Sequence, residues 1–220
     1  ITTADGGTLT KTVTLRPALL DLVWQADSAV PPLYRGKALP ATKNMVRFVA
    51  IPHFIQNGVE LDPARLVYQW SLDFEPVASA SGLGKNSFST RIVDLIGETR
   101  VGVKVTTLDS EIAASKTLAV SPVDPLVSLV KLDDLEGPAL DQPLPGKYEL
   151  TASEITLRAV SYYFPKSRSI KPGLRYYFSV NGKGAVTGQN NPEVLTLRQE
   201  SNSSGQANIA ISLEDPFDTM

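Results

Sequence analysis

The chain of 220 residues contains no cysteine and a single histidine, His53. The lack of cysteine excludes a disulfide framework, a thiolate nucleophile and a cysteine-ligated metal. Serine–histidine–aspartate chemistry would depend on His53 alone, and a zinc site with several histidines is excluded. His53 follows an apolar run that stops at Pro52, so we interpret it as a strand-end or turn residue. We therefore expect no enzyme, no cofactor and no metal site.

An excess of charge of one sign is also lacking. The 21 Lys and Arg residues nearly balance 23 Asp and Glu residues, which gives a net charge of −2. This balance provides no field to attract nucleic acid or an anionic membrane. No apolar run reaches the roughly 18 residues that a membrane helix needs. We expect no nucleic-acid partner and no membrane span in this chain.

The sequence is instead rich in short segments whose apolar residues recur at every second position, which is the period of a half-buried β-strand. Asn-Gly pairs at 57–58 and 181–182 and Ser-Gly at 204–205 predict turns between such segments, and residues 62–65 predict one helical turn. Such strands hide their apolar faces by stacking sheets. The predicted strands are Thr8–Leu15, Met45–Ile51, Leu66–Leu72, Arg100–Thr106, Ile112–Val120, Ile155–Val160, Leu174–Val180, Val194–Leu197 and Ala207–Leu213.

The two halves of the sequence match each other at a nearly constant spacing. Most matches lie 108 positions apart, and a drift of a few positions is what loop insertions would produce. Their common order predicts a duplicated domain. The matched residues are Leu66 with Leu174, Tyr68 with Tyr176, Trp70 with Phe178, Gly97 with Gly205, Val101 with Ile209 and Val103 with Ile211.

The repeat is out of phase with the start of the chain. Residues 11–17 resemble residues 116–122, which follow the Arg100–Thr106 strand and predict the last strand of the first domain. We therefore expect residues 1–17 to hold a candidate donor strand, 18–123 to form domain 1, and 124–220 to form domain 2 without its closing strand. Two alternatives stay open: the sequence is a fragment, or residues 8–15 are simply the first strand of domain 1.

Three segments carry a resemblance to bacterial immunoglobulin-like or PKD-like extracellular domains: Leu66–Trp70, Ser81–Phe88 and Arg100–Thr106. The resemblance implies two tandem immunoglobulin-like antiparallel β-sandwich domains, all-β in class, with an aromatic on the third strand at the centre of the sandwich. It also implies a secreted or cell-surface protein without catalytic residues. The disulfide of antibody-type domains and the Gly-Asp-Gly turn of PKD repeats are both absent.

Two polar clusters are candidates for a binding site. Gly82–Asn86 is similar to a phosphate loop, but it lacks the first glycine and the final Ser or Thr, so we interpret it as a turn between strands. Asp133, Asp134, Glu136 and Asp141 resemble a calcium cluster, but they lack the spacing of a calcium loop, so we interpret them as a solvated acidic loop.

Two aromatic trios lie in the second half, at residues 162–164 and 176–178. Because side chains alternate along a strand, at least one aromatic of each trio is expected to point away from the core. Tyr163 and Tyr177 are the candidates for a ligand-binding platform, and such a platform would make the chain an adhesin or a glycan-binding module. An ordinary sheet surface is the competing interpretation.

A sandwich without its closing strand presents an open edge that can pair with another chain. The first function that we expect is a structural protein of the bacterial surface, self-associating head-to-tail into a filament or surface layer by β-strand complementation. Other surface proteins or glycans are further candidate partners. The residues expected at the interface are Leu9, Val13 and Leu15 of the donor strand and Ile209, Ile211 and Leu213 of the acceptor.

Overall fold

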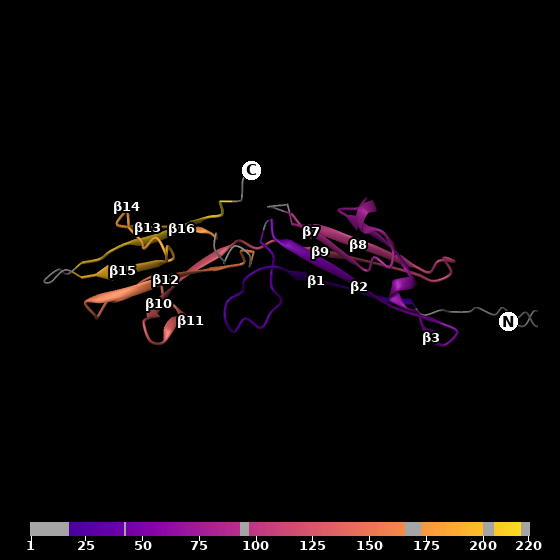
Figure 1. The fold of residues 1–220 in the computed structure, drawn as a ribbon, viewed down its shortest axis with the longest axis horizontal. Helices are drawn as coiled ribbons and strands as arrows, with labels where there is room; N and C mark the ends of the chain where they lie inside the picture. Colours follow the sequence, from indigo (N-terminus) through magenta and orange to yellow (C-terminus); the bar gives the residue numbers. More distant parts are fainter. Residues whose placement is uncertain (1–17, 42, 93–96, 166–172, 200–204, 217–220) are drawn as a thin grey trace, which may run out of the picture. The chain divides into compact units, whose positions relative to one another are not determined.

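The computed structural model describes residues 18–41, 43–92, 97–165, 173–199 and 205–216. Within these ranges the chain is all-β, with two single-turn 3-10 helices, η1 (Pro63–Arg65) and η2 (Ala78–Ala80), between its strands (Figure 1). Neither helical turn in the described ranges has the length or the apolar character needed to cross a membrane. The predicted strand Thr8–Leu15 and Ser204 of the predicted turn lie outside the described residues.

Strands β1 to β9, which we call the first repeat, form two sheets. One sheet has the order β1-β2-β3, with β7 also paired to β2, and the other has the order β5-β4-β8-β9, with β6 also paired to β4. The bounds are β1 Ala18–Ala26, β2 Met45–Gln56, β3 Val59–Glu60, β4 Val67–Leu72, β5 Glu75–Pro76, β6 Gly82–Leu83, β7 Ser87–Arg91, β8 Thr99–Thr106 and β9 Ala113–Val120.

The two sheets of the first repeat pack face to face through aromatic side chains. Trp70 of β4 lies with its ring centroid 5.8 Å from that of Phe88 in β7, and Phe88 stacks on Phe48 of β2 at 6.4 Å. The alternating residues that were expected to face inward from β4 and β8 are fully buried, which confirms the two-residue period as the source of the core. These residues are Leu66, Tyr68, Trp70, Val101, Val103 and Val105, whereas Leu72 is half-buried.

Strand β2 continues past Pro52 to Gln56, so the expectation that it stops at Pro52 is wrong. The Ala50 N–H donates to the Asn86 carbonyl at 2.9 Å, immediately before β7 begins. The N–H position of Pro52 faces the same side of β2, past the first residue of β7. A proline there removes no hydrogen bond of the β2–β7 ladder. His53 therefore lies inside a strand and not at its end.

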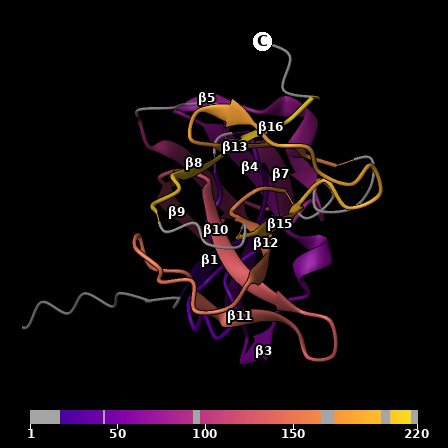
Figure 2. The ribbon, with the colours of Figure 1, turned by 90° about the vertical axis from the view of Figure 1, so that its left-hand side faces the viewer.

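Strands β10 to β16, the second repeat, also form two sheets, with the orders β11-β10-β12-β15 and β14-β13-β16. Figures 1 and 2 show β13 and β16 in one layer and β10 and β12 in the other. Ala159, Phe178 and Leu195 form the core between them. The bounds are β10 Leu126–Asp133, β11 Gly137–Pro143, β12 Glu154–Tyr162, β13 Arg175–Val180, β14 Lys183–Gly184, β15 Val194–Arg198 and β16 Ile209–Glu214.

The described chain divides into two compact units, each assembled from several segments. The first unit takes β3, β4, β5, β6, β8 and β9 with the larger parts of β1 and β2. The second unit takes residues 25–47 and 89–98, as far as they are described, together with everything described after residue 120. Within the second unit, the loop after β1 binds the end of β12. Ala29 donates to the Phe164 carbonyl at 3.0 Å and accepts from the Tyr163 N–H at 2.7 Å.

The repeat seen in the sequence is present in the backbone pairing. Val67 lies opposite Thr106 in the β4–β8 pair, and Arg175 lies opposite Glu214 in the β13–β16 pair, with every number 108 higher. The hairpins β4–β5 and β13–β14 show the same shift. Both carry a positive-φ pair at the turn, Asp73-Phe74 and Asn181-Gly182. The 108-residue spacing therefore relates hydrogen-bonded strands and is not a coincidence of composition.

Candidate interaction site at the edge of β16

Strand β16 has the position in its sheet that β8 has in the first repeat, but it has fewer neighbours. β8 lies between β4 and β9, whereas β16 pairs with β13 on one side and, in the part of the chain that the structure describes, with no strand on the other. Among the described residues, the second side of β16 is therefore an open sheet edge.

The direction of the backbone groups on this edge follows from the adjoining strand. The Phe178 carbonyl accepts from Ala185 N–H at 2.8 Å, on the β14 side, so the peptide groups of Phe178 point away from β16. Phe178 lies opposite Ile211. In an antiparallel pair, residues opposite each other direct their peptide groups either toward one another or both outward. The N–H and C=O groups of Ile209, Ile211 and Leu213 therefore face the open edge.

The side chains of the same three residues are only partly covered. Ile209 and Ile211 pack against the core cluster of Ala159, Phe178 and Leu195, and both remain half-buried. Their counterparts in β8, Val101 and Val103, are 0% and 2% exposed. The edge thus combines unpaired ladder groups with apolar side chains that a further strand would cover.

The donor residues Leu9, Val13 and Leu15 lie outside the described residues. Their pairing with Ile209, Ile211 and Leu213 stays a prediction. The described part of the site is the acceptor half alone.

Tyr177 lies on the outer face of the same sheet, half-exposed beside the open edge. Its hydroxyl donates to Glu214 Oε2 at 2.7 Å, joining β13 to β16, and Arg175 Nη1 lies 3.7 Å from the same carboxylate. The hydrogen bond to Glu214 raises the pKa of Tyr177 above its usual value, and desolvation and the Glu214 charge act in the same direction. The outward orientation expected for this trio is confirmed at Tyr177.

Tyr163 has a different environment, so Tyr163 and Tyr177 do not share one sheet. β12 ends at Tyr162, and Tyr163 has a φ of 65°, which breaks the alternation on which the expectation rested. Tyr162 is buried at 6% exposure, while Tyr163 and Phe164 are half-buried. A ligand-binding role for Tyr163 stays a prediction.

Asn44, which the sequence pattern did not single out, is buried next to Tyr163. Its Nδ2 donates to the Tyr163 carbonyl at 2.8 Å, and its own carbonyl accepts from Ile92 N–H at 3.1 Å. Asn44 Oδ1 is buried without a hydrogen-bond partner in the described structure. The side chain therefore helps to hold the loop after β1 at the end of β12. A lone asparagine between two apolar segments gives no periodic signal that would reveal this role.

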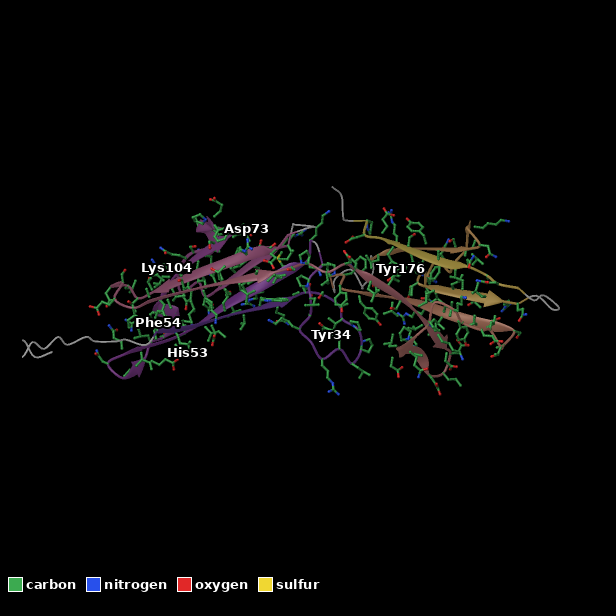
Figure 3. The ribbon with its side chains drawn as sticks, turned by 180° about the vertical axis from the view of Figure 1, so that it is seen from behind. Tyr34, His53, Phe54, Asp73, Lys104 and Tyr176 are labelled. Carbon is green, nitrogen blue, oxygen red and sulfur yellow. The ribbon has the colours of Figure 1, made fainter. Side chains whose placement is uncertain are left out.

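The remaining polar candidates lie in or next to the β2–β3 hairpin and the segment between β6 and β7. His53 Nδ1 lies 3.2 Å from Glu60 Oε1 on the exposed side of the β2–β3 hairpin, while the neighbouring Phe54 is buried (Figure 3). Gly82–Asn86 forms an interstrand segment in which the Lys85 carbonyl accepts from Trp70 Nε1 at 2.8 Å. Both residues of this contact lie in the first compact unit.

The acidic cluster occupies the turn between β10 and β11. Asp133 Oδ1 accepts from the N–H groups of Leu135 and Glu136, at 2.8 and 3.1 Å, and these bonds lower the pKa of Asp133. Asp141 lies in β11 and not in this turn. Across the described ranges, no three acidic or histidine side chains gather as metal ligands would.

Each unit also has a surface hollow. One, of about 510 Å³, lies over the outer face of β4, β8 and β9 around Gly102, where Ser71, Ser115, Thr117 and Lys104 line it. The other, of about 400 Å³, lies in the second unit and includes Arg158 and Glu193, an ion pair at 3.6 Å. Both hollows are partly open to solvent.

Comparison with known proteins adds no family to this description. No protein-family model matches the chain, and no curated protein matches its sequence.

Proposed function

We propose that this chain is a non-catalytic structural protein of the bacterial cell surface, secreted or surface-displayed, which assembles head-to-tail by β-strand complementation. The observation that carries the proposal is the open edge of β16. The residues of β8 that correspond to Ile209, Ile211 and Leu213 are covered by β9. The second repeat offers the same surface without a described strand on it.

The donor proposed for this edge is Thr8–Leu15. Residues 11–17 resemble residues 116–122, and most of the latter segment belongs to β9. The segment that resembles β9 is therefore offered to the strand that corresponds to β8. Main-chain hydrogen bonds supply the affinity in such a pairing, and Leu9, Val13 and Leu15 supply the apolar contacts.

This contact joins different surfaces of two identical chains. A heterologous contact of this kind adds one copy after another and builds a filament or an open array unless the rotation closes a ring. A cell-surface filament or surface layer is the assembly that we propose, in keeping with the resemblance to extracellular bacterial domains.

The test compares the full chain with two truncations, by electron microscopy and by light scattering over a concentration series. Removal of residues 1–17 is expected to abolish polymers, whereas removal of residues 1–7, which spares Thr8–Leu15, is expected to leave them intact. A matching far-ultraviolet circular dichroism spectrum checks that both truncations fold. Polymers that persist without residues 1–17, with an unchanged repeat distance, would contradict the proposal.

A second candidate function, an adhesin or glycan-binding module, is favoured by Tyr177. Its ring is 50% exposed beside Glu214 and Arg175, and an exposed aromatic flanked by hydrogen-bonding groups suits stacking on a sugar. Glycan-array binding that is lost in Tyr177→Ala and kept in Tyr163→Ala would support this function. Equal array signals from Tyr177→Ala and the parent chain would remove it.

A further inference from the structure

We propose that Thr8–Leu15 pairs with β16 of another copy in one particular antiparallel register, with Leu9 opposite Leu213, Lys11 opposite Ile211 and Val13 opposite Ile209. This inference rests on the assembly proposed above and adds the geometry of its contact. It commits to one occupant of the open edge, a named segment of this same chain.

The register is transferred from the first repeat. In the β8–β9 pair, Val101 lies opposite Leu118, Val103 opposite Lys116 and Val105 opposite Ala114. The three β8 residues correspond to Ile209, Ile211 and Leu213 through the spacing of 108 that relates β4–β8 to β13–β16. The β9 residues correspond to positions 105 lower, since Lys116–Pro122 resembles Lys11–Pro17. The pairs are Leu118 with Val13, Lys116 with Lys11 and Ala114 with Leu9.

The transferred register places the side chains consistently on both faces of the sheet. Leu9, Val13 and Leu15 share the inner face with Ile209 and Ile211. On the outer face, Thr12 meets Ala210, which lies opposite Ser179. This row of three repeats a row of the first repeat, in which Gly102 lies between Ser71 and Thr117.

Lys11 takes an inward position in this register, as its counterpart Lys116 does in the first repeat. Its counterpart Lys116 lies on the edge strand opposite Val103, with its side chain 46% exposed and its Nζ 3.1 Å from Asp21. An edge strand can place a lysine at an inward position because the long side chain reaches solvent around the open border of the sandwich. A slip of two residues would place this lysine opposite Ile209 or Leu213 instead of Ile211, which the cross-linking experiment below distinguishes.

The outer-face pairs are suited to cross-linking. Val77 donates to the Trp70 carbonyl at 2.9 Å on the far side of β4, so the peptide groups of Gly102 point toward β4 and away from β9. Gly102 and Thr117 thus form a pair without mutual hydrogen bonds, in which the Cα atoms are about 4.5 Å apart. Thr12 with Ala210 and Thr10 with Ser212 take the same geometry. A slip of two residues separates such Cα atoms by about 8 Å, beyond the reach of a disulfide.

The experiment mixes separately purified single-cysteine chains under oxidising conditions. A tagged donor, Thr10→Cys or Thr12→Cys, is combined with an untagged acceptor, Ala210→Cys or Ser212→Cys, in all four combinations. The parent chain has no cysteine, so every disulfide involves introduced thiols only. The tag distinguishes a mixed dimer from a dimer of two donors or two acceptors on a non-reducing gel.

Mixed dimers are expected to form at least about tenfold faster for Thr12→Cys with Ala210→Cys, and for Thr10→Cys with Ser212→Cys, than for the two slipped combinations. Faster reaction in either slipped combination would overturn the register and leave strand complementation standing. Absence of mixed dimers in all four mixtures would also overturn the register. Electron microscopy of the same mixtures then separates the two proposals. Polymers without cross-links would reject the register and the donor segment, whereas an absence of polymers would reject the assembly itself.

Discussion

Strands β8 and β16 have the same register with their preceding partner strands, and they differ in what lies on their other side. β8 pairs with β9, and its three inward valines are 0–2% exposed. β16 has an open side in the described structure, and its inward residues are only half-buried. Isoleucine and leucine are larger and no less apolar than valine, so the greater exposure of β16 accompanies the side on which the described residues place no strand.

The turns that follow β4 and β13 show how far the equivalence of the two repeats extends. Asp73 accepts the Arg100 N–H at 2.7 Å, and Asn181 accepts the Asn208 N–H at 2.8 Å. Both acceptors have positive φ, at 48° and 50°, a conformation that Asp and Asn tolerate better than most residues. The two repeats therefore share one hairpin design, and among the described residues the outer neighbour of β8 has no counterpart beside β16.

The largest expected effect lies in the two cores. Trp70 is 1% exposed, contacts Phe88 and donates its Nε1–H to Lys85, so Trp70→Ala is expected to destabilise the first repeat by about 3–5 kcal/mol. Phe178→Ala, at the matching position, is expected to cost less, about 3 kcal/mol, because its neighbour β16 is open on one side. Urea denaturation followed by circular dichroism measures both. A larger loss for Phe178→Ala would break the comparison.

The next effect concerns the outer face. A Cβ at Gly102 would lie 2.5 Å from Ser71 Oγ and 3.4 Å from Thr117 Oγ1, so neighbours on both sides limit the space there. Gly102→Val is expected to cost about 2 kcal/mol by overpacking. Ala210→Val, with a described neighbour on one side only, is expected to cost less than about 0.5 kcal/mol. Equal losses in urea denaturation would show that β16 is as enclosed as β8.

The alkaline limit of the first repeat gives a third test. Burial, with a smaller contribution from the charge of Asp62, raises the pKa of Tyr68 to about 12. Below pH 10 both folded and unfolded chains keep this proton. Between pH 10 and 12 the unfolded chain loses it first, so the free energy of unfolding falls by about 1.4 kcal/mol per pH unit.

Tyr68→Phe is the matched control for that titration. The variant loses the hydrogen bond from the hydroxyl to the Pro63 carbonyl, at 2.9 Å, and is expected to be about 1 kcal/mol less stable at neutral pH. Its stability is expected to fall less steeply above pH 10. Denaturation midpoints of both chains, measured from pH 8 to 12, test this expectation. If the midpoints of parent and variant fall equally with pH, groups other than Tyr68 cause the loss of stability.

Much of the fold could be predicted from the sequence wherever the apolar residues alternate. β4, β8, β12 and β13 show this pattern, and the expected Asn57-Gly58 and Asn181-Gly182 turns join the hairpins that follow β2 and β13. β1 and β10 were missed because apolar residues occur on both faces. In β1, Leu20 is buried while the adjacent Leu19 is 59% exposed, so no two-residue period is visible.

The acceptor half of the candidate site could be predicted because it depends on the same alternation. Ile209, Ile211 and Leu213 lie on one face of β16, and the 108-residue spacing relates them to β8. The surroundings of Tyr163 could not be predicted, because the prediction assumed that strand alternation continues through residue 163. The backbone has a positive φ at that residue. The sequence pattern gives no signal for that turn or for the role of Asn44.

The smallest effect comes from exchanging the turn residues. Asp73→Asn and Asn181→Asp keep an oxygen acceptor and a side chain that tolerates positive φ, so each is expected to change stability by less than about 0.5 kcal/mol. Asp73→Ala and Asn181→Ala remove the hydrogen bond and are expected to cost about 1 kcal/mol each. Thermal denaturation compares the four variants. An alanine that is harmless at one turn and costly at the other would show that the hairpins differ.

The most direct measurement of the open edge is amide hydrogen exchange at Ile209, Ile211 and Leu213, in a chain without residues 1–17, before and after addition of a synthetic peptide of residues 8–15. The account predicts fast exchange at these three amides in the truncated chain and slowing by about 100-fold with the peptide. The amides of Val101, Val103 and Val105, already bonded to β9, are expected not to change. Slow exchange at β16 without the peptide, or no slowing with it, would contradict the account.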